Sequence, residues 1–514
     1  MNFQREIRHG LATRLCQKPE VIQIGKITIG LFFLYHISNR FYYAFIGPLS
    51  KIPGPWIEKI FPELGGLFGK HHSQRFITLK KYHEKYGHIV RIGPTEISIS
   101  DKDMLKQILV TEDLSKGLGY KRFQNGGRAN IFDTTDKGFH RQRRRLVSPA
   151  FSIKYINSLE PLIESVTESL IARINRNIEG TKSSKGFGQI DIWRLFQLFS
   201  LDVVGETSFG GTFNALEDSN HVVPVTISKL LRTLGFVVNY PWIVKLLRIK
   251  KAKKTPRLVA FATDIVLGRL EKGDRRNDIL QIMIDTQKAA KEEDRLSTDD
   301  IISEITMFLV AGTETISGTM GFVFIELCRH KNVWLKLRDE IDGIVLEEGK
   351  KFPCQSQLKD LPYLNAVINE TMRLNSIVSN GIDRIATRDI FMKGDVLVPE
   401  GTTVRCSPWI AQTHPDYWPE PLSFNPDRWL PGTDSKPNME AYFPFSTGSR
   451  NCIGKTLAIN EMRLVISALI KNFDLDDIPK EMMAANEKRY YITLTLESGS
   501  FKLLLKPRNA CPQL

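Results

Sequence analysis

The segment from Ser297 to His330 limits the folds open to this chain more than any other stretch of its sequence. It is apolar for more than thirty residues, and Ser297 followed by Asp300 predicts a capped helix start. A helix of that length spans roughly 50 Å at 1.5 Å per residue. A helix so apolar must run through a core and not over a surface. We therefore expect a large protein built around one central helix.

The middle of this segment contains residues that a buried helix does not need. Gly312, Thr313, Glu314 and Thr315 follow one another within Ala311–Ser317. A glycine costs about 1 kcal/mol in a helix, and a buried carboxylate costs more unless it is paired. The stretch therefore indicates a functional role that compensates the lost stability.

A second unusual segment is FPFSTGSRNCIGKTLA, Phe443–Ala458, which places Cys452 just before an apolar helix. A disulfide, a nucleophile, a zinc site or a metal thiolate would each explain a lone cysteine. The chain has six cysteines without a C-x-x-C pair, which disfavours a disulfide framework or a structural zinc site and favours a reducing compartment. They are Cys16, Cys328, Cys354, Cys406, Cys452 and Cys511.

The composition is that of a globular protein: 514 residues, 42% of them hydrophobic and 25% charged. Such a chain can bury a bulky cofactor. The net charge of +14 favours an acidic partner. The basic run His140–Val147 comes with no nucleic-acid-binding signature, so we expect no nucleic-acid partner. A second run, Lys245–Lys254, follows the apolar stretch Phe236–Val244 and suits either a membrane surface or a solvated helix face.

The N-terminal region contains an apolar segment, Ile27–Ile46, with the length of one bilayer crossing. His36 and Arg40 interrupt it, which leaves an ordinary buried helix as the alternative. A stiff Pro-Gly-Pro hinge within Lys51–Trp56 follows. We expect residues 1–50 to form a membrane anchor with its flank, and residues 51–514 to form one folded domain. Positive charges before the anchor conflict with a cytosolic domain under the positive-inside rule; they are Arg5, Arg8, Arg14 and Lys18.

Strands are expected in only a few places. Tyr86–Asp101 reads as two short strands around a Gly-Pro turn, and Ile492–Pro507 as a hairpin of two strands. Helices dominate from about Asp103 onward. The predicted fold class is therefore mainly α with a small β-sheet.

Four motifs occur in a fixed order along the chain. They are Ala311-Gly312-x-Glu314-Thr315, Glu370-x-x-Arg373, FNPDRW (Phe424–Trp429) and Phe445-x-x-Gly448-x-Arg450-x-Cys452-x-Gly454. In this order and at these spacings they resemble the cytochrome P450 family, over about Lys51 to Arg508. The apolar N-terminus before IPGP is similar to that of microsomal members, and HRQRRRLVSPAFS is similar to fungal ones. The resemblance implies the P450 fold.

The resemblance also implies haem b, with the Cys452 thiolate as the axial ligand of the iron. Propionate partners would be Arg450, Arg384, His140 and Arg144. Gly448 would permit a tight turn, and Gly454 would let the backbone approach the porphyrin. Ala311 and Gly312 would let the long helix open over the haem, and Phe445 belongs to the same haem-contacting set.

Further roles follow from the resemblance. Thr315 would hydrogen-bond the activated oxygen and Glu314 would relay protons from solvent; a merely distorted helix is the alternative. Glu370, Arg373 and Arg428 would form a buried network that holds the cysteine loop, although E-x-x-R alone is usually an ordinary helix ion pair.

The implied activity is hydroxylation of a lipophilic small molecule with O2 and electrons from NADPH–cytochrome P450 reductase, so that NADPH acts only indirectly. Cytochrome b5 is a further candidate partner, and the endoplasmic reticulum membrane with a cytosolic catalytic domain is the expected location. The alternatives are a haem-thiolate isomerase or dehydratase that needs no reductase, and a non-enzymatic haem sensor.

An apolar pocket fits a steroid or terpenoid. A fatty acid or xenobiotic is also possible, because Lys121, Arg122 or Arg128 could hold a carboxylate. The expected pocket residues are Tyr120, Phe123, Ile131, Phe132, Phe308, Ala311, Thr315, Ile377, Val378 and Ile382.

Overall fold

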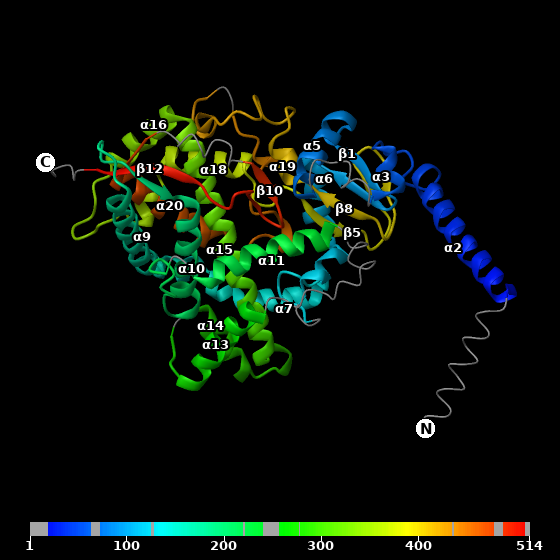
Figure 1. Cartoon of the computed structure of the whole chain (residues 1–514), viewed down its shortest axis with the longest axis horizontal. Helices are drawn as coiled ribbons and strands as arrows, with labels where there is room; N and C mark the ends of the chain where they lie inside the picture. Colours follow the sequence, from blue (N-terminus) through cyan, green and yellow to red (C-terminus); the bar gives the residue numbers. More distant parts are fainter. Residues whose placement is uncertain are drawn as a thin grey trace.

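Helix α15, Thr298–Arg329, runs through the middle of the molecule (Figure 1). The computed structural model describes residues 19–62, 72–124, 128–218, 221–239, 256–276, 278–433, 436–476 and 487–508. Ser297 and Asp300 form a reciprocal capping box at the start of α15, as the sequence predicts. The predicted central helix is therefore confirmed.

Helix α10, Ile192–Phe209, packs along α15 at positions where α15 has glycine. A Cβ atom at Gly312 would lie 2.6 Å from Val204 Cγ2, and one at Gly321 would lie 2.5 Å from Trp193 Cε3. Gly312 therefore has a packing role, because it lets the two helices approach closely.

Most of the other helices in the described residues lie around this pair or beside the main sheet, whereas α2 extends away from the body (Figure 1). They are α2 (Pro19–Phe45), α3 (Trp56–Ile60), α5 (Arg75–Tyr86), α6 (Lys102–Lys106), α7 (Lys137–Val147), α8 (Ile153–Ser158), α9 (Glu160–Thr181), α11 (Val222–Asn239), α13 (Pro256–Lys272), α14 (Ile279–Asp285), α16 (Lys331–Asp342), α17 (Gln355–Leu358), α18 (Pro362–Leu374), α19 (Pro408–Gln412) and α20 (Lys455–Asn472).

The main sheet has five strands in the order β1-β2-β8-β5-β3. The predicted pair within Tyr86–Asp101 is confirmed, since β1 and β2 are antiparallel neighbours. The strands are β1 (Ile89–Gly93), β2 (Glu96–Ile99), β3 (Ser115–Lys116), β4 (Gly188–Asp191), β5 (Ile382–Ile385), β6 (Ile390–Met392), β7 (Val396–Val398), β8 (Thr403–Cys406), β9 (Phe473–Leu475), β10 (Lys488–Tyr490), β11 (Leu494–Leu496) and β12 (Lys502–Pro507). The mainly helical class with small sheets is thus confirmed.

The predicted C-terminal hairpin within Ile492–Pro507 is wrong. Both strands exist, but β11 pairs with β10, whereas β12 pairs with β4 and β9. The side chain of Asp191, at the end of β4, accepts hydrogen bonds from Ser500 Oγ at 2.6 Å and Phe501 N at 3.2 Å. These contacts hold the chain beside β4 just before β12, so a distant strand replaces the local partner.

Helix α2 projects from the rest of the molecule (Figure 1). Five consecutive side chains, Leu31 to Tyr35, are 58–66% exposed, so apolar residues face outward on every side. The C-terminal end of α2 is docked, because Arg40 Nη1 donates to the Ile60 carbonyl at 3.1 Å. In the described part of the chain, one helix is long and apolar enough to cross a membrane, namely α15 with the residues before it, Glu292–Arg329. Its most apolar stretch is 72% buried inside the protein. The basic run Lys245–Lys254 and the four N-terminal charges lie outside the described residues.

Candidate active site

Cys452 lies in a loop whose backbone is fixed on both sides. Its amide donates to the Phe445 carbonyl at 2.9 Å, and α20 begins three residues later. Gly448 adopts φ of +76°, and a Cβ there would overlap the Leu109 carbonyl oxygen. The turn before the cysteine therefore requires glycine.

The Cys452 side chain is not fully covered by protein atoms. Its side chain has accessible surface, yet burial within the surrounding protein raises the pKa of the thiol. A side chain can be accessible and still be surrounded by protein when it borders an enclosed space. A Cβ atom at Gly454 would meet only Phe151, at 4.0 Å, so the backbone borders open room here. A thiol in such a place can become a metal ligand once a cation stabilises its thiolate.

Several buried cations gather near one another. Burial, followed by the charges of Arg384 and Arg450, holds the pKa of Lys116 well below its usual value. Burial and four cations, with Arg450 and Lys116 first among them, lower the pKa of His140 to about 3. Burial and the Arg384 charge lower the pKa of Arg450 to about 10. This concentration of positive charge calls for an anionic ligand.

Two predicted propionate partners are held by protein atoms. Arg144, on α7, donates to Asn451 O and Oδ1, both at 2.6 Å. It therefore fastens α7 to the residue beside Cys452. Arg450 donates to the carbonyls of Thr134 at 3.0 Å and Asp136 at 3.2 Å. These contacts position both guanidinium groups next to the cysteine loop.

Helix α15 shows one partly exposed face within an otherwise buried stretch. Phe308, Ala311 and Thr315 each have accessible surface, and their spacing places them on one side. The predicted opening at Ala311 and Gly312 is not observed, because α15 is continuous there. The Thr315 hydroxyl donates to the Ala311 carbonyl at 2.7 Å, an ordinary bond within the helix. Its oxygen lone pairs stay available to a ligand on that face.

Glu314 points toward α10 and α11. Its Oε1 accepts weak hydrogen bonds from Gln197 Nε2 at 3.5 Å and Ser228 Oγ at 3.4 Å. The residue is 7% exposed, and burial raises the pKa of the carboxyl to about 7. A carboxyl with this pKa is partly protonated near neutral pH and can both accept and release a proton.

The predicted pocket residues form recognisable groups. Three aromatic rings, those of Tyr120, Phe123 and Phe132, contact one another with centroids 5.6–6.0 Å apart. The neighbouring Ile131 is held by its amide, which donates to the Glu304 carboxylate on α15 at 3.0 Å. This segment is therefore tied to the central helix.

The remaining pocket positions lie before and within β5. Ile377 Cδ1 would lie 3.2 Å from a Cβ at Gly318, so Ile377 packs on α15 about one turn beyond Thr315. Val378 is 37% exposed, and Ile382 begins β5. Arg128 does not reach a pocket: it pairs with Asp299 and Asp300, each at 3.1 Å, at the exposed start of α15.

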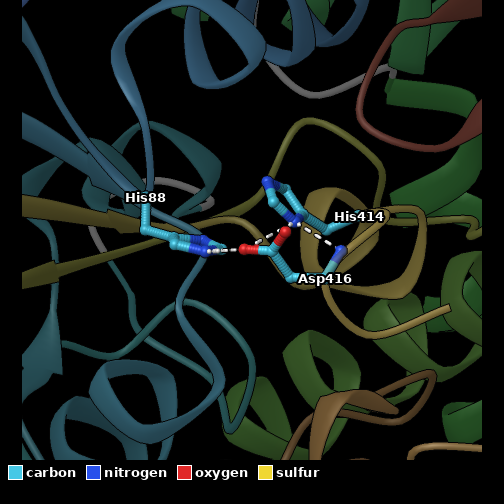
Figure 2. Close-up of side chains that lie close together, drawn as sticks. All are labelled: His88, His414 and Asp416. Carbon is cyan, nitrogen blue, oxygen red and sulfur yellow. Dashed lines mark hydrogen bonds and ion pairs between the residues drawn. The ribbon is translucent and has the colours of Figure 1, made fainter.

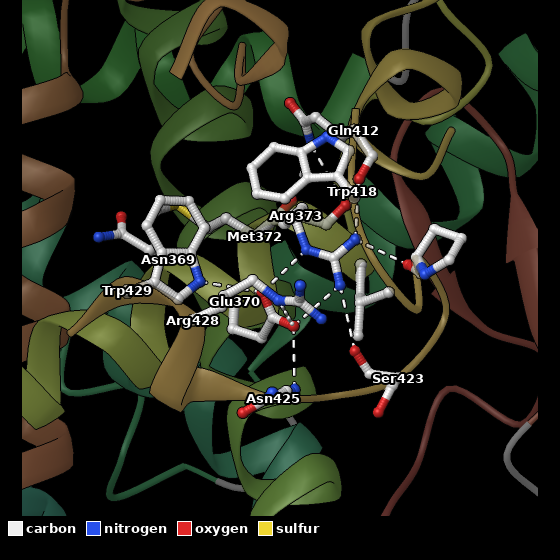
Figure 3. Close-up of polar contacts among 12 residues, drawn as sticks. Asn369, Glu370, Met372, Arg373, Gln412, Trp418, Ser423, Asn425, Arg428 and Trp429 are labelled. Carbon is white, nitrogen blue, oxygen red and sulfur yellow. Dashed lines mark hydrogen bonds and ion pairs between the residues drawn. The ribbon is translucent and has the colours of Figure 1, made fainter. Parts of the chain in front are cut away.

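Glu370 is the centre of a buried ionic network (Figure 3). Arg373 donates to both of its oxygens at 2.8 Å, and Arg428 Nε donates at 3.0 Å. Trp429 Nε1 and the Asn425 amide complete the set at 2.9 Å each. The arginines outweigh the opposing effect of burial and lower the pKa of Glu370.

The two arginines of the network also bind backbone. Arg373 donates to the carbonyls of Gln412, Pro421 and Ser423, at 2.7–3.1 Å. Arg428 Nη1 donates to the Pro419 carbonyl at 3.0 Å. The network therefore clamps α18 to the chain that leads toward the cysteine loop.

Haem fits these residues. The Cys452 thiol is a suitable axial donor, and the cations around His140 and Arg450 suit two carboxylates. Gly454 permits a close approach to the backbone, since a Cβ atom there would meet only Phe151, at 4.0 Å. The fit between haem and these residues therefore depends on the thiol donor, the positive charge and the accessible backbone at Gly454.

Comparison with known proteins decides the family. A family model described as Cytochrome P450 matches residues 55–505. This chain belongs to the cytochrome P450 family. It is 31% identical over 450 residues to cytochrome P450 monooxygenase LUC2 of a Fusarium species, a match that covers 86% of this chain and 85% of the relative. It is 33% identical to cytochrome P450 monooxygenase acrD of Aspergillus aculeatus, with 86% and 89% covered. For cytochrome P450 3A9 of Rattus norvegicus the identity is 29%, with 87% and 89% covered.

Relatives such as LUC2 and acrD are named monooxygenases, and this P450 therefore belongs to the monooxygenase class. The sequence did not predict one buried residue of the candidate site, Lys116. Lys116 is 7% exposed, donates to the Phe132 carbonyl and lies 4.9 Å from the Tyr120 ring centroid. A lysine in a polar-looking stretch gives no local signal of burial, so only the folded chain reveals it.

Proposed function

We propose that this P450 hydroxylates a lipophilic small molecule, a steroid or terpenoid in preference to a fatty acid or a xenobiotic. The observation that carries the proposal is the pair of buried Glu314 and partly exposed Thr315 on the central helix. A carboxyl whose pKa is raised to about 7, next to a partly exposed hydroxyl, suits controlled proton delivery. Neither an isomerase or dehydratase nor a haem sensor needs this pair.

Bound haem b would supply the activation of dioxygen. Cys452 would hold it, and His140, Arg384, Arg450 and Lys116 would orient its carboxylates. Glu314 would pass protons inward from the α10–α11 side, and the Thr315 hydroxyl would hydrogen-bond the reacting oxygen. The aromatic residues Tyr120, Phe123 and Phe132 would keep water away from the substrate.

The substrate class is supported by the apolar wall. With Arg128 bound to Asp299 and Asp300, one of the three cations that could hold a fatty-acid carboxylate is committed elsewhere. Lys121 and Arg122 are exposed. Incubating the protein with purified reductase, NADPH and a panel of steroids, terpenoids and fatty acids tests the preference. Carboxylic-acid products alone would contradict it.

Replacing Thr315 with valine should uncouple electron use from product formation. Valine has nearly the same shape, so packing changes little, but the hydroxyl is lost. We expect continued NADPH consumption, several-fold less product and more hydrogen peroxide in a reductase-coupled assay that measures all three. Thr315→Ser, which keeps the hydroxyl, is the matched control and should stay coupled. Unchanged coupling in the valine variant would remove Thr315 from the mechanism.

Electrons would come from NADPH–cytochrome P450 reductase, with cytochrome b5 as a further donor. The support is a basic surface beside the cysteine loop, where α7 exposes Lys137 and Arg141. A pocket of about 260 Å³ lies there, and its lining includes these two residues, three further arginines and one acid; the latter are Arg144, Arg145, Arg450 and Asp113. An acidic protein surface would be attracted to it, and the attraction would weaken with salt.

We also propose that α2 anchors the P450 in the endoplasmic reticulum membrane with the catalytic domain in the cytosol. The exposed apolar side chains from Leu31 to Tyr35 support a bilayer contact. Ala44 and Leu49 are 0% and 4% exposed, so the last turns of this region belong to the folded body. The anchor would therefore end before Arg40.

Deleting residues 1–37 should release most of the protein from membranes and leave haem content unchanged, because the deletion spares Arg40, Ala44 and Leu49. Fractionation of expressing cells and the haem-to-protein ratio measure both outcomes. Residual attachment is expected if the segment Phe236–Lys254 also contacts the bilayer. A truncated protein that stays fully in the membrane, or loses its haem, would refute the anchor role.

A further inference from the structure

Three side chains from two distant parts of the chain meet beside the five-stranded sheet: His88, His414 and Asp416 (Figure 2). Asp416 Oδ2 lies 3.0 Å from His88 Nε2 and 3.6 Å from His414 Nδ1. Candidate ligand atoms of all three lie within 4.8 Å of one another. Ligands of one tetrahedral zinc ion, bound at about 2.0–2.2 Å, lie roughly 3.3–3.6 Å apart. Small shifts would therefore complete a metal site.

The His88 ring is already oriented for ligation. Its Nδ1 lies 3.2 Å from Ser100 Oγ, which leaves Nε2 facing Asp416. Tyr417 stacks on the ring with centroids 5.5 Å apart. Because the Asp416 carboxylate can only accept, Nε2 donates to it in this structure. A metal would replace that proton, and Nδ1–H would then donate to the serine. A hydrogen-bonded partner of this kind commonly fixes the tautomer of a ligating histidine.

His414 presents its Nδ1 lone pair on the same side. That atom accepts a hydrogen bond from the Asp416 amide at 3.2 Å, so it carries no proton. The amide contact is long and would give way to a metal.

The charges around the cluster permit a cation. Lys80 lies near His414, but its amine pairs with Glu84 at 3.1 Å and donates to the Thr413 carbonyl at 3.3 Å. Asp416 itself is an anion whose side chain is 60% exposed, so solvent has access to a fourth coordination position. Two imidazoles and one carboxylate suit zinc, whereas calcium and magnesium prefer oxygen ligands alone.

We propose that His88, His414 and Asp416 bind a zinc ion, with water as the fourth ligand. None of these residues belongs to the candidate haem site. The ion would cross-link the segment before β1 to the segment after α19, 328 positions apart from His88 to Asp416. Both segments border the main sheet, so zinc would stabilise that part of the fold by binding only its folded form.

Equilibrium dialysis of the full-length, untagged, haem-loaded protein against zinc chloride tests the site. One zinc ion per chain should bind more tightly than any other. His88→Ala and Asp416→Asn should each weaken this binding by at least the roughly 10–100-fold that loss of a second-shell partner costs. His330→Ala is the matched control, since His330 is partly exposed near the Glu326 carboxylate, 3.9 Å away, and belongs to no such cluster among the described residues. It should leave zinc binding unchanged.

X-ray absorption at the zinc edge gives an independent readout that haem does not obscure. The expected spectrum has nitrogen and oxygen ligands with two imidazoles. The haem content of each variant shows whether it is folded. The proposal is overturned if the unmodified protein binds zinc no more tightly than the folded His88→Ala and Asp416→Asn variants, or if the spectrum shows sulfur ligands.

Discussion

Replacing Cys452 with serine is expected to abolish the thiolate-type difference spectrum that the reduced protein gives with carbon monoxide. A serine hydroxyl is a poor donor to haem iron and does not ionise near neutral pH. Product formation should fall to background in the reductase-coupled assay. The loop itself should persist, because the bond from residue 452 to the Phe445 carbonyl uses the backbone amide.

Cys354→Ser is the matched control. Cys354 is a free, partly exposed cysteine that lies outside the candidate site. This variant should keep the spectrum and the turnover of the unmodified protein. If Cys452→Ser also kept both, the axial ligand would have to be another residue, and the assignment of the whole loop would fail.

Replacing Arg373 with alanine is expected to give aggregated protein or protein with little haem. The change leaves Glu370 with one arginine and strips three backbone carbonyls of their donor. Removing one partner of a buried ion pair costs roughly 3–5 kcal/mol, which is a large share of the stability of a typical domain. Soluble yield, haem content and the urea midpoint of unfolding measure the loss.

Arg176→Ala gives the matched comparison. Arg176 pairs with Glu217 at 2.7 Å, but both side chains are more than half exposed. Such pairs contribute about 0–1 kcal/mol, so this variant should unfold at nearly the same urea concentration as the unmodified protein. If Arg373→Ala unfolded at the same urea concentration as Arg176→Ala, the buried network would not contribute to the stability of the fold.

Features with a local cause could be predicted from the sequence. Ser297 and Asp300 form their capping box within four residues, and the strands of Tyr86–Asp101 are joined by a tight turn. The Cys452 loop is similarly local, because its glycines and cysteine lie in one short motif. Spacing alone carries such information.

Features that depend on distant partners could not be predicted. The C-terminal strands were expected to pair with each other, but β12 pairs with β4, more than 300 positions earlier. Arg144 donates to the Asn451 carbonyl and side chain, a pairing that no motif predicts. Gly312 was expected to open α15 and instead lets α10 approach. In each case the competing partner is set by tertiary packing, which no motif records.

The central claim is that this P450 inserts one oxygen atom from O2 into a lipophilic substrate. Labelling with ¹⁸O2 tests it most directly. The purified protein, reductase, NADPH and the substrate panel are incubated under the labelled gas, and products are analysed by mass spectrometry. We predict a product that carries one ¹⁸O atom and forms only when NADPH is present. An unlabelled product, or one that forms without NADPH and reductase, would contradict the claim and favour an isomerase or dehydratase.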